Sequence, residues 1–305
     1  MGWRTKIIDY KSYLQIERNL SKNSIESYIS DIYKLVNYLN DFNIGSAPIS
    51  IQKKDIQQFI YEIAKIVSPR TQARIISGLR SFFDYLIFEG YREDNPLDLI
   101  KSPKIGRKLP DTLSKPEIDK LISTIDLSHP QGERNRTILE TIYGCGLRVS
   151  ELINLRISDL FFDEGFIKVS GKGDKSRFVP IHHTTIKYIN TYIHEVRNHI
   201  TPHKEDSDIV FLNRRGKRLT RQMIFIIIKN LCAKANIQKT VGPHTLRHSF
   251  ATYLLTEGVD LRAIQQLLGH ESITTTEIYV HLDNKYLQEV VENFHPRSNT
   301  SRKEK

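Results

Sequence analysis

Two cationic side chains near the middle of the sequence stand where they could approach an anionic ligand. Arg148 follows two glycines that are typical of a helix end, and the residues after it favour the start of a new helix. Lys172 stands between two glycines at the turn of an expected hairpin. Taken singly, such residues are more often solvated surface cations than parts of a site.

The segment His244-Thr-Leu-Arg-His248 is more specific. On a helix, the i, i+3 and i, i+4 spacing places His244, Arg247 and His248 on one face, opposite an apolar face. We therefore expect all three side chains to point outward from a helix that is buried on its other side. Zinc proteases with the H-E-x-x-H pattern also pair histidines in this way, but Thr245 stands where they need a glutamate.

A further histidine and a tyrosine follow in the next part of the sequence. The residues Leu261–Leu268 predict an apolar helix that ends at Gly269, directly before His270. The capping-box pattern Thr274-Thr-Thr-Glu277 predicts a short helix that carries Tyr279. Two adjacent helix ends predict a turn across which His270 and Tyr279 can meet.

Together these residues give the order R…K…H-x-x-R…H…Y within the motifs GLRVSEL, SGKGDKSRFVPI, HTLRHSFAT and LLGHESITTTEIYVH. The set resembles the tyrosine site-specific recombinases, and most of all their bacterial XerC/XerD branch. The resemblance extends over essentially the whole chain. It implies a catalytic set that consists of Arg148, Lys172, His244, Arg247, His270 and Tyr279, with Glu151 as support for the first arginine.

The residue types suit transesterification of a phosphodiester. Two guanidinium groups can hold the non-bridging oxygens as charge develops in the transition state, and Tyr279 is the nucleophile. A phenol is mostly protonated at neutral pH, so His244 is expected to handle its proton, with His270 at a phosphate oxygen. Lys172 can protonate the leaving 5′ oxygen. The cationic side chains already neutralise the phosphate, so we expect neither a metal ion nor a nucleotide cofactor.

The resemblance implies site-specific recombination through a 3′-phosphotyrosyl intermediate and a Holliday junction, with chromosome dimer resolution at a dif-like site as the favoured role. A mobile-element integrase or excisionase of the same family remains open, as does relaxation like that of a type IB topoisomerase. A DNA-binding regulator without chemistry would explain the charge but not the six residue types in register. A histidine metallohydrolase would require bound zinc.

The charge distribution supports a nucleic-acid partner. The chain of 305 residues has 45 Lys and Arg against 35 Asp and Glu, a net charge of +10. Residues 1–103 carry 14 basic and 12 acidic side chains, so 31 basic and 23 acidic side chains, an excess of +8, lie beyond them. All 11 histidines also lie there. The two cysteines, Cys145 and Cys232, exclude a disulfide framework and are expected to be buried.

The hydrophobic pattern predicts a mainly α protein in two domains. Residues 1–100 read as a bundle of amphipathic helices, which the resemblance identifies as the SAM-like core-binding domain. Residues 101–110 are rich in proline and basic side chains, and predict a linker. Residues 111–305 are expected to form a mainly α catalytic domain.

Within the second domain, three strands of a small antiparallel sheet are expected at Leu160–Phe162, Phe166–Ser170 and Arg177–Ile181. After Thr184 the pattern predicts helix, apart from turns at 202–208 and 214–217.

Basic residues of the first domain and the linker are candidates for contact with DNA phosphates. They are Lys53, Lys54, Arg70, Arg74, Arg80, Lys101, Lys104, Arg107 and Lys108. The resemblance implies double-stranded DNA with a specific site as substrate, and the chain itself or a paralogous recombinase as partner in a cyclic tetramer. It also leaves open a DNA translocase of the division septum as a further partner. The first residues lack the apolar block of a signal peptide and no run suits a membrane span, so a cytoplasmic location is expected.

An apolar stripe near the C-terminus raises the question of assembly. Leu287, Val290, Val291 and Phe294 fall at i, i+3, i+4 and i+7 on an expected helix. The resemblance implies that this helix packs into a neighbouring protomer. The alternative is that it docks on its own domain.

Overall fold

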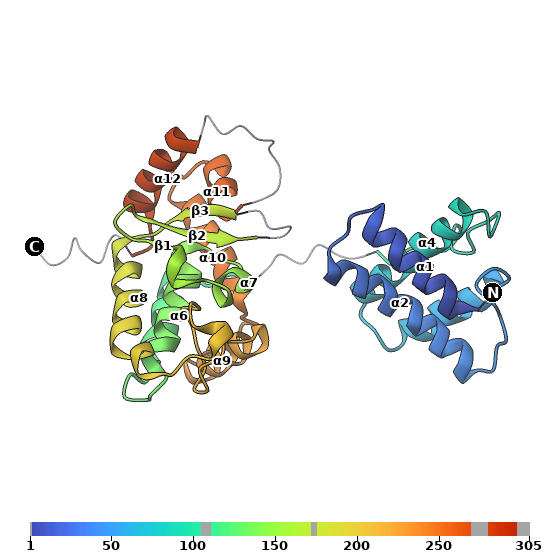
Figure 1. Ribbon diagram of the computed structural model, residues 1–305, viewed down its shortest axis with the longest axis horizontal. Coiled ribbons are helices and arrows are strands. Elements are labelled where there is room, and N and C mark those ends of the chain that lie inside the picture. Colours follow the sequence, from blue (N-terminus) through green and yellow to red (C-terminus); the bar gives the residue numbers. More distant parts are fainter. Residues whose placement is uncertain (1, 105–110, 172–175, 270–279, 298–305) are drawn as a thin grey trace, which may run out of the picture. The chain divides into compact units, whose positions relative to one another are not determined.

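The computed structural model describes residues 2–104, 111–171, 176–269 and 280–297, with side chains from residue 287 onward in the last stretch. The chain divides into two compact units, residues 1–108 and 109–305 (Figure 1). This boundary lies within the segment for which the sequence predicts a linker. No helix in the described ranges is long and apolar enough to cross a membrane.

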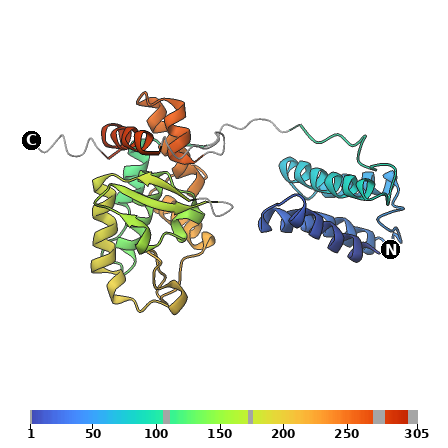
Figure 2. The same cartoon turned by 45° about the horizontal axis from the view of Figure 1, so that its top comes forward.

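The first unit is helical throughout its described core. Its helices are α1 (Trp3–Ile16), α2 (Lys22–Asp41), α3 (Lys53–Ala64) and α4 (Pro69–Phe88). Serine caps start two of them, because the Oγ atoms of Ser21 and Ser68 accept the backbone N–H of the residue three positions on. The helices of this unit lie close together (Figure 2). Their buried apolar side chains form one core, in which the rings of Tyr10 and Phe82 meet edge to face.

The second unit contains eight helices and one small sheet in its described residues. They are α5 (Lys115–Ser123), α6 (Gly132–Cys145), α7 (Val149–Ile153), β1 (Leu160–Phe161), β2 (Phe166–Ser170), β3 (Ser176–Pro180), α8 (His183–Glu195), α9 (Arg221–Lys234), α10 (Pro243–Thr256), α11 (Leu261–Leu268) and α12 (Val280–Phe294). Helix α6 is buried along most of its length and packs against α8 and α10, so it is the central element of this unit.

The sheet is antiparallel with the order β1-β2-β3. In its register Ile167 lies opposite Val179, and Val169 lies opposite Arg177. Ile167, Val169 and Val179 are buried in the main core, so this face of the sheet is the inner one. Arg177 therefore stands at an inward position among apolar residues.

The predicted mainly α fold with a small three-stranded antiparallel sheet is confirmed. One local prediction was wrong, because residues 209–213 do not continue the helical pattern. Ile209 forms a bridge with Arg156, and the Val210 N–H donates to the Leu155 carbonyl. Three consecutive buried residues, 210–212, need partners on several sides, which a helix with a single buried face does not provide.

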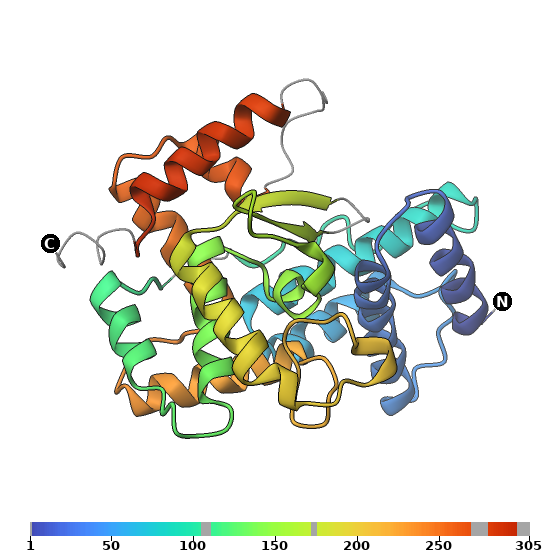
Figure 3. The same cartoon turned by 60° about the vertical axis from the view of Figure 1, so that its left-hand side comes forward.

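The C-terminal helix α12 lies beside the sheet (Figures 1 and 3) and packs on β3. Leu287, Val290 and Val291 are buried in the core of their own unit, whereas Phe294 is exposed. In the single chain three of the four stripe residues are therefore covered by their own unit, whereas packing of this helix into a neighbouring protomer stays a prediction. Strand β3 provides part of the surface that covers them, which the sequence pattern alone does not reveal.

Two stacked histidines anchor the residues that follow α12. The imidazole rings of His182 and His295 lie 4.5 Å apart and are nearly parallel, and both side chains are buried. His295 Nε2 donates to the Gly144 carbonyl at 3.0 Å, while its Nδ1 accepts the Arg297 N–H at 3.1 Å. These two bonds need the neutral ring, since a protonated imidazole has no acceptor. Burial lowers the pKa of His182 to about 4 and that of His295 to about 3.

These lowered pKa values predict a loss of stability at mildly acidic pH. The folded protein keeps both rings neutral, while the unfolded chain takes up protons as the pH falls below about 6.5. The stability due to neutral burial is therefore complete above that pH and is lost progressively as the pH falls toward the folded-state values. Between about pH 7.5 and 5.5, the free energy of unfolding should fall by about 2–3 kcal/mol.

Urea unfolding at the two pH values measures this loss, and His295→Gln should reduce it. His199→Gln, at an exposed position, is the matched control for the substitution itself. Equal pH dependence in all three proteins would contradict the assignment.

Candidate active site

The end of α6 fixes the position of Arg148. Gly146 closes the helix in the left-handed conformation with φ of 57°, and its N–H donates to the Ile142 carbonyl. A Cβ at this glycine would lie 2.7 Å from the ring of Phe250, so a side chain has no room there. Two residues later Arg148 precedes α7, and its backbone N–H donates to Glu151 Oε2 at 2.8 Å. Arg148 is thus held at a short turn between two helices.

The carboxylate of Glu151 is the centre of a cluster of three guanidinium groups. Arg148 donates to Oε1 at 2.8 Å, and Arg177 donates to both oxygens at 2.6 and 3.2 Å. Arg247 Nη1 lies 3.8 Å from Oε2. The Glu151 side chain is fully buried, with 0% exposure. Burial by itself raises the pKa of the Glu151 carboxyl, but Arg177 and Arg148 outweigh it and hold the pKa below its ordinary value.

Arg247 corrects an expectation drawn from the sequence, because its side chain is buried rather than turned outward. Its guanidinium group donates to the carbonyls of Gly146 and Leu268, which lie at the ends of α6 and α11. Burial, together with the nearby charge of Arg148, lowers the pKa of Arg247 to about 10, so it stays protonated at neutral pH. A long arginine on an apparently polar face can turn inward where main-chain acceptors are present.

The cluster carries a net charge of +2, from three guanidinium groups and one carboxylate. Arg148 is the most accessible of the three, with 35% of its side chain exposed, against 20% for Arg177 and 9% for Arg247. Its second nitrogen donates to the Gly269 carbonyl at 2.8 Å, directly before position 270. Planar donors with excess positive charge suit a phosphate group that gains negative charge during reaction.

The structure thus brings together Arg148, Arg247 and Glu151 of the predicted set. His244 lies at the start of α10, one turn before Arg247, and is exposed, as is His248. Lys172, His270 and Tyr279 lie outside the described residues.

Arg177 is the residue of this cluster that the sequence analysis did not include. The alternation along the strand could have indicated that Arg177 points inward, since it stands two residues before the buried Val179 and opposite the buried Val169. A charged residue at an inward strand position needs a buried partner of opposite charge. The partner, Glu151, is 26 residues away in the sequence.

The basic candidates of the first unit differ in their surroundings. Lys54, Arg70, Lys101 and Lys104 are exposed, and Lys53 is half-buried. Arg80 donates to the carbonyls of Leu97 and Ile100, so its guanidinium group ties the segment after α4 to the bundle. Arg107 and Lys108 lie outside the described residues.

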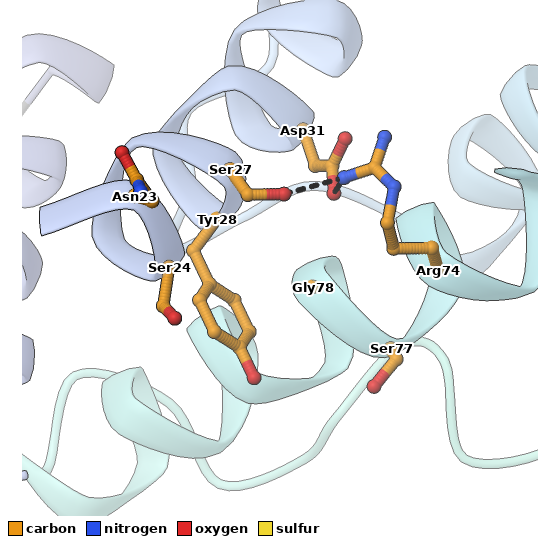
Figure 4. Close-up of a pocket in the computed structure, with 8 residues that line it drawn as sticks. All are labelled: Asn23, Ser24, Ser27, Tyr28, Asp31, Arg74, Ser77 and Gly78. Atoms are coloured by element: carbon orange, nitrogen blue, oxygen red, sulfur yellow. Dashed lines mark hydrogen bonds and ion pairs between the residues drawn. The ribbon is translucent and has the colours of Figure 1, made fainter. Parts of the chain in front are cut away.

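Arg74 stands at a polar pocket of about 400 Å³ between α2 and α4 (Figure 4). Its guanidinium group pairs with the buried Asp31 and donates to Ser27 Oγ at 2.8 Å. Lys34 binds the same carboxylate at 2.8 Å. The pocket is lined by Asn23, Ser24, Ser27, Tyr28, Asp31, Arg74, Ser77 and Gly78. Two cations on one carboxylate leave a positive excess at this surface.

Comparison with known proteins establishes the class. The model of the phage integrase family matches residues 111–285, and that of the phage integrase N-terminal SAM-like domain matches residues 7–90. The chain belongs to the phage integrase family. It is a tyrosine recombinase, an enzyme that cleaves and rejoins DNA strands.

Among individual relatives, the tyrosine recombinase XerD of Listeria innocua is 41% identical over 293 residues, covering 96% of this chain and 99% of its own. That of Staphylococcus haemolyticus is 42% identical over 295 residues, with the same coverage of 96% and 99%. The crystal structure of the XerH recombinase bound to a palindromic difH substrate matches with a TM-score of 0.69 and 26% identity, covering 90% of this chain and 81% of that one. Lambda integrase matches in fold, with a TM-score of 0.71, 18% identity and coverage of 91% and 100%.

No group of three or more His, Cys, Asp or Glu side chains in the described part of the chain is arranged to hold a metal ion.

The close packing at Gly146 leads to a stability prediction. Gly146→Ala should cost about 1–2 kcal/mol for the left-handed backbone and a further cost of about 1–3 kcal/mol for contact with Phe250. Gly258→Ala is the matched control, since Gly258 also has a positive φ, of 91°, but nothing lies within 4 Å of its Cβ position. Urea unfolding should therefore show the larger loss for Gly146→Ala. Equal losses would mean that Phe250 does not confine this turn.

Proposed function

We propose that this recombinase acts on duplex DNA at a specific dif-like site and resolves chromosome dimers, through a 3′-phosphotyrosyl intermediate and a Holliday junction. The observation that carries the chemistry is the pair Arg148 and Arg247, held around one buried carboxylate in a cluster with net positive charge. Support for the role comes from relatives named XerD and from the XerH complex with difH DNA. The identity of 41–42% to the XerD relatives, against 18% to lambda integrase, favours this role over that of a mobile-element integrase.

The two arginines would hold the scissile phosphate. Arg247 is fixed by carbonyls of two helix ends, so it is a rigid donor, whereas the more exposed Arg148 turns an accessible edge toward a ligand. Attack on phosphorus adds negative charge to the non-bridging oxygens, and donors fixed in advance stabilise that charge without reorganising. These two side chains would thus bind the transition state more tightly than the ground state.

The remaining roles follow from the family resemblance. Tyr279 would attack phosphorus, His244 would take its proton, and His270 would hold a phosphate oxygen. Lys172 would give a proton to the departing 5′ oxygen. Attack by the 5′ hydroxyl of the partner duplex would then reverse the phosphotyrosyl bond and join the exchanged strands.

DNA binding and assembly complete the proposal. Lys53, Lys54, Arg70, Lys101 and Lys104 would contact backbone phosphates, as would Arg74, which Asp31 holds at the pocket between α2 and α4. The active form would be a cyclic tetramer of this chain, or of this chain with a paralogous recombinase, on two sites. A DNA translocase of the division septum would act on that assembly.

The nucleophile provides the direct test. Tyr279→Phe removes only one hydroxyl, so it should bind DNA with unchanged affinity and form no covalent adduct. The substrate is a duplex selected by repeated binding from a pool of randomised duplexes, with a nick that traps cleaved ends. Adducts are counted on denaturing gels, and their tyrosine is identified by peptide mass spectrometry.

Tyr286→Phe, seven residues further on, is the matched control and should form adduct normally. An adduct that persists in Tyr279→Phe would overturn the assignment. A plasmid with two selected sites separates the reactions, since recombination yields two circles, whereas a topoisomerase only relaxes supercoils.

A further inference from the structure

We propose that Arg177 is a positioning residue, which serves as the permanent counter-ion of Glu151 and thereby frees Arg148 for the scissile phosphate. This inference rests on the proposed function, because it concerns the same reaction. Arg177 lies within the motif SGKGDKSRFVPI, but it is not among the six expected catalytic positions.

The contacts divide the cluster into two kinds of ion pair. Arg177 binds both oxygens of Glu151, at 2.6 and 3.2 Å, whereas Arg148 binds through a single side-chain bond at 2.8 Å. The bidentate pair is the stronger and the more restricted in geometry. Arg148 also has the larger exposed fraction, at 35% against 20%. The geometry therefore assigns the carboxylate mainly to Arg177 and leaves Arg148 accessible.

Burial makes this division necessary. The Glu151 side chain is fully buried, and a buried carboxylate that loses its partners is strongly destabilised. If Arg148 shifts toward a phosphate, Glu151 still keeps both bonds from Arg177 and the bond from the Arg148 N–H. Without Arg177, the phosphate and Glu151 would compete for Arg148.

The net charge of the cluster also indicates that Arg177 supports the reaction. The native cluster carries three positive charges and one negative charge, a net charge of +2. Arg177→Gln lowers the net charge to +1, Glu151→Gln raises it to +3, and the double variant returns it to +2. The phosphorane of the transition state gains a second negative charge, so the loss of one positive charge should slow the reaction more than it weakens binding.

Arg177 is also held where it can act on the active-site backbone. A Cβ at Gly269 would lie 2.7 Å from Arg177 Nε, so the arginine packs closely against this residue. The Gly269 carbonyl in turn accepts from Arg148 at 2.8 Å. Arg177 therefore lies directly against the two groups that orient Arg148, namely the Glu151 carboxylate and the main chain at Gly269.

The test compares affinity for the selected nicked duplex with the single-turnover rate of adduct formation. Arg177→Gln should bind within about threefold of the native protein, yet form adduct on the order of 10- to 100-fold more slowly. Arg177→Lys keeps the charge but not the bidentate geometry, so its rate of adduct formation should lie between those of the native protein and Arg177→Gln. Arg136→Gln is the matched control, since Arg136 also binds both oxygens of a carboxylate, that of Glu133, and is 23% exposed.

The decisive variant is Glu151→Gln/Arg177→Gln, which should form adduct faster than Arg177→Gln alone. It removes the competing carboxylate and restores the net charge of +2. A merely structural role for Arg177 predicts the opposite, namely a double variant that is no faster than the single one. That result, or a native rate in Arg177→Gln, would overturn the inference.

Failure of the proposed function looks different, because the native protein itself would then form no phosphotyrosyl adduct with any selected duplex.

Discussion

A buried carboxylate that stays ionised is the constraint on which this active site depends. Glu151 has no access to water, so its charge must be compensated by neighbouring groups, and the structure supplies three guanidinium groups around it. Arg148 and Arg177 are in turn held by hydrogen bonds to that carboxylate, whereas Arg247 is fixed by the carbonyls of two helix ends. The same pairing keeps two arginines close together, although their like charges would otherwise drive them apart. An excess of +2 charge in one small region is the result.

The helices and the sheet act mainly by delivering main-chain groups to this region. The ends of α6 and α11 provide the carbonyls of Gly146, Leu268 and Gly269, which accept from Arg247 and Arg148. Strand β3 adds Arg177 from the inner face of the sheet. The C-terminal segment reaches the same helix, because His295 binds the Gly144 carbonyl. The end of α6 is thus supported from several parts of the unit, so that Arg148 does not depend on the conformation of one loop.

Local sequence signals are enough to predict helices and strands. Contacts between residues that are far apart in the sequence cannot be predicted from such signals. The glycine after α11 depends on a few neighbouring residues, so the helix end at Gly269 could be predicted, and the serine caps at Ser21 and Ser68 are equally local. The inward position of Arg247 could not, because its acceptors lie 101 and 21 residues away. Arg177 and the docking of α12 on its own unit depend in the same way on tertiary packing. The identities of the nucleophile and the general acid rest on family resemblance.

The ionisation state of Glu151 tests this account most directly. It can be followed by the pH dependence of the side-chain carboxyl ¹³C shift in protein labelled at glutamate, with Glu151→Gln to assign the resonance. Arg177 and Arg148 outweigh the effect of burial, so we expect a pKa below the ordinary value for glutamate. A pKa raised above that value would mean that burial outweighs the two arginines and that Glu151 does not hold them together.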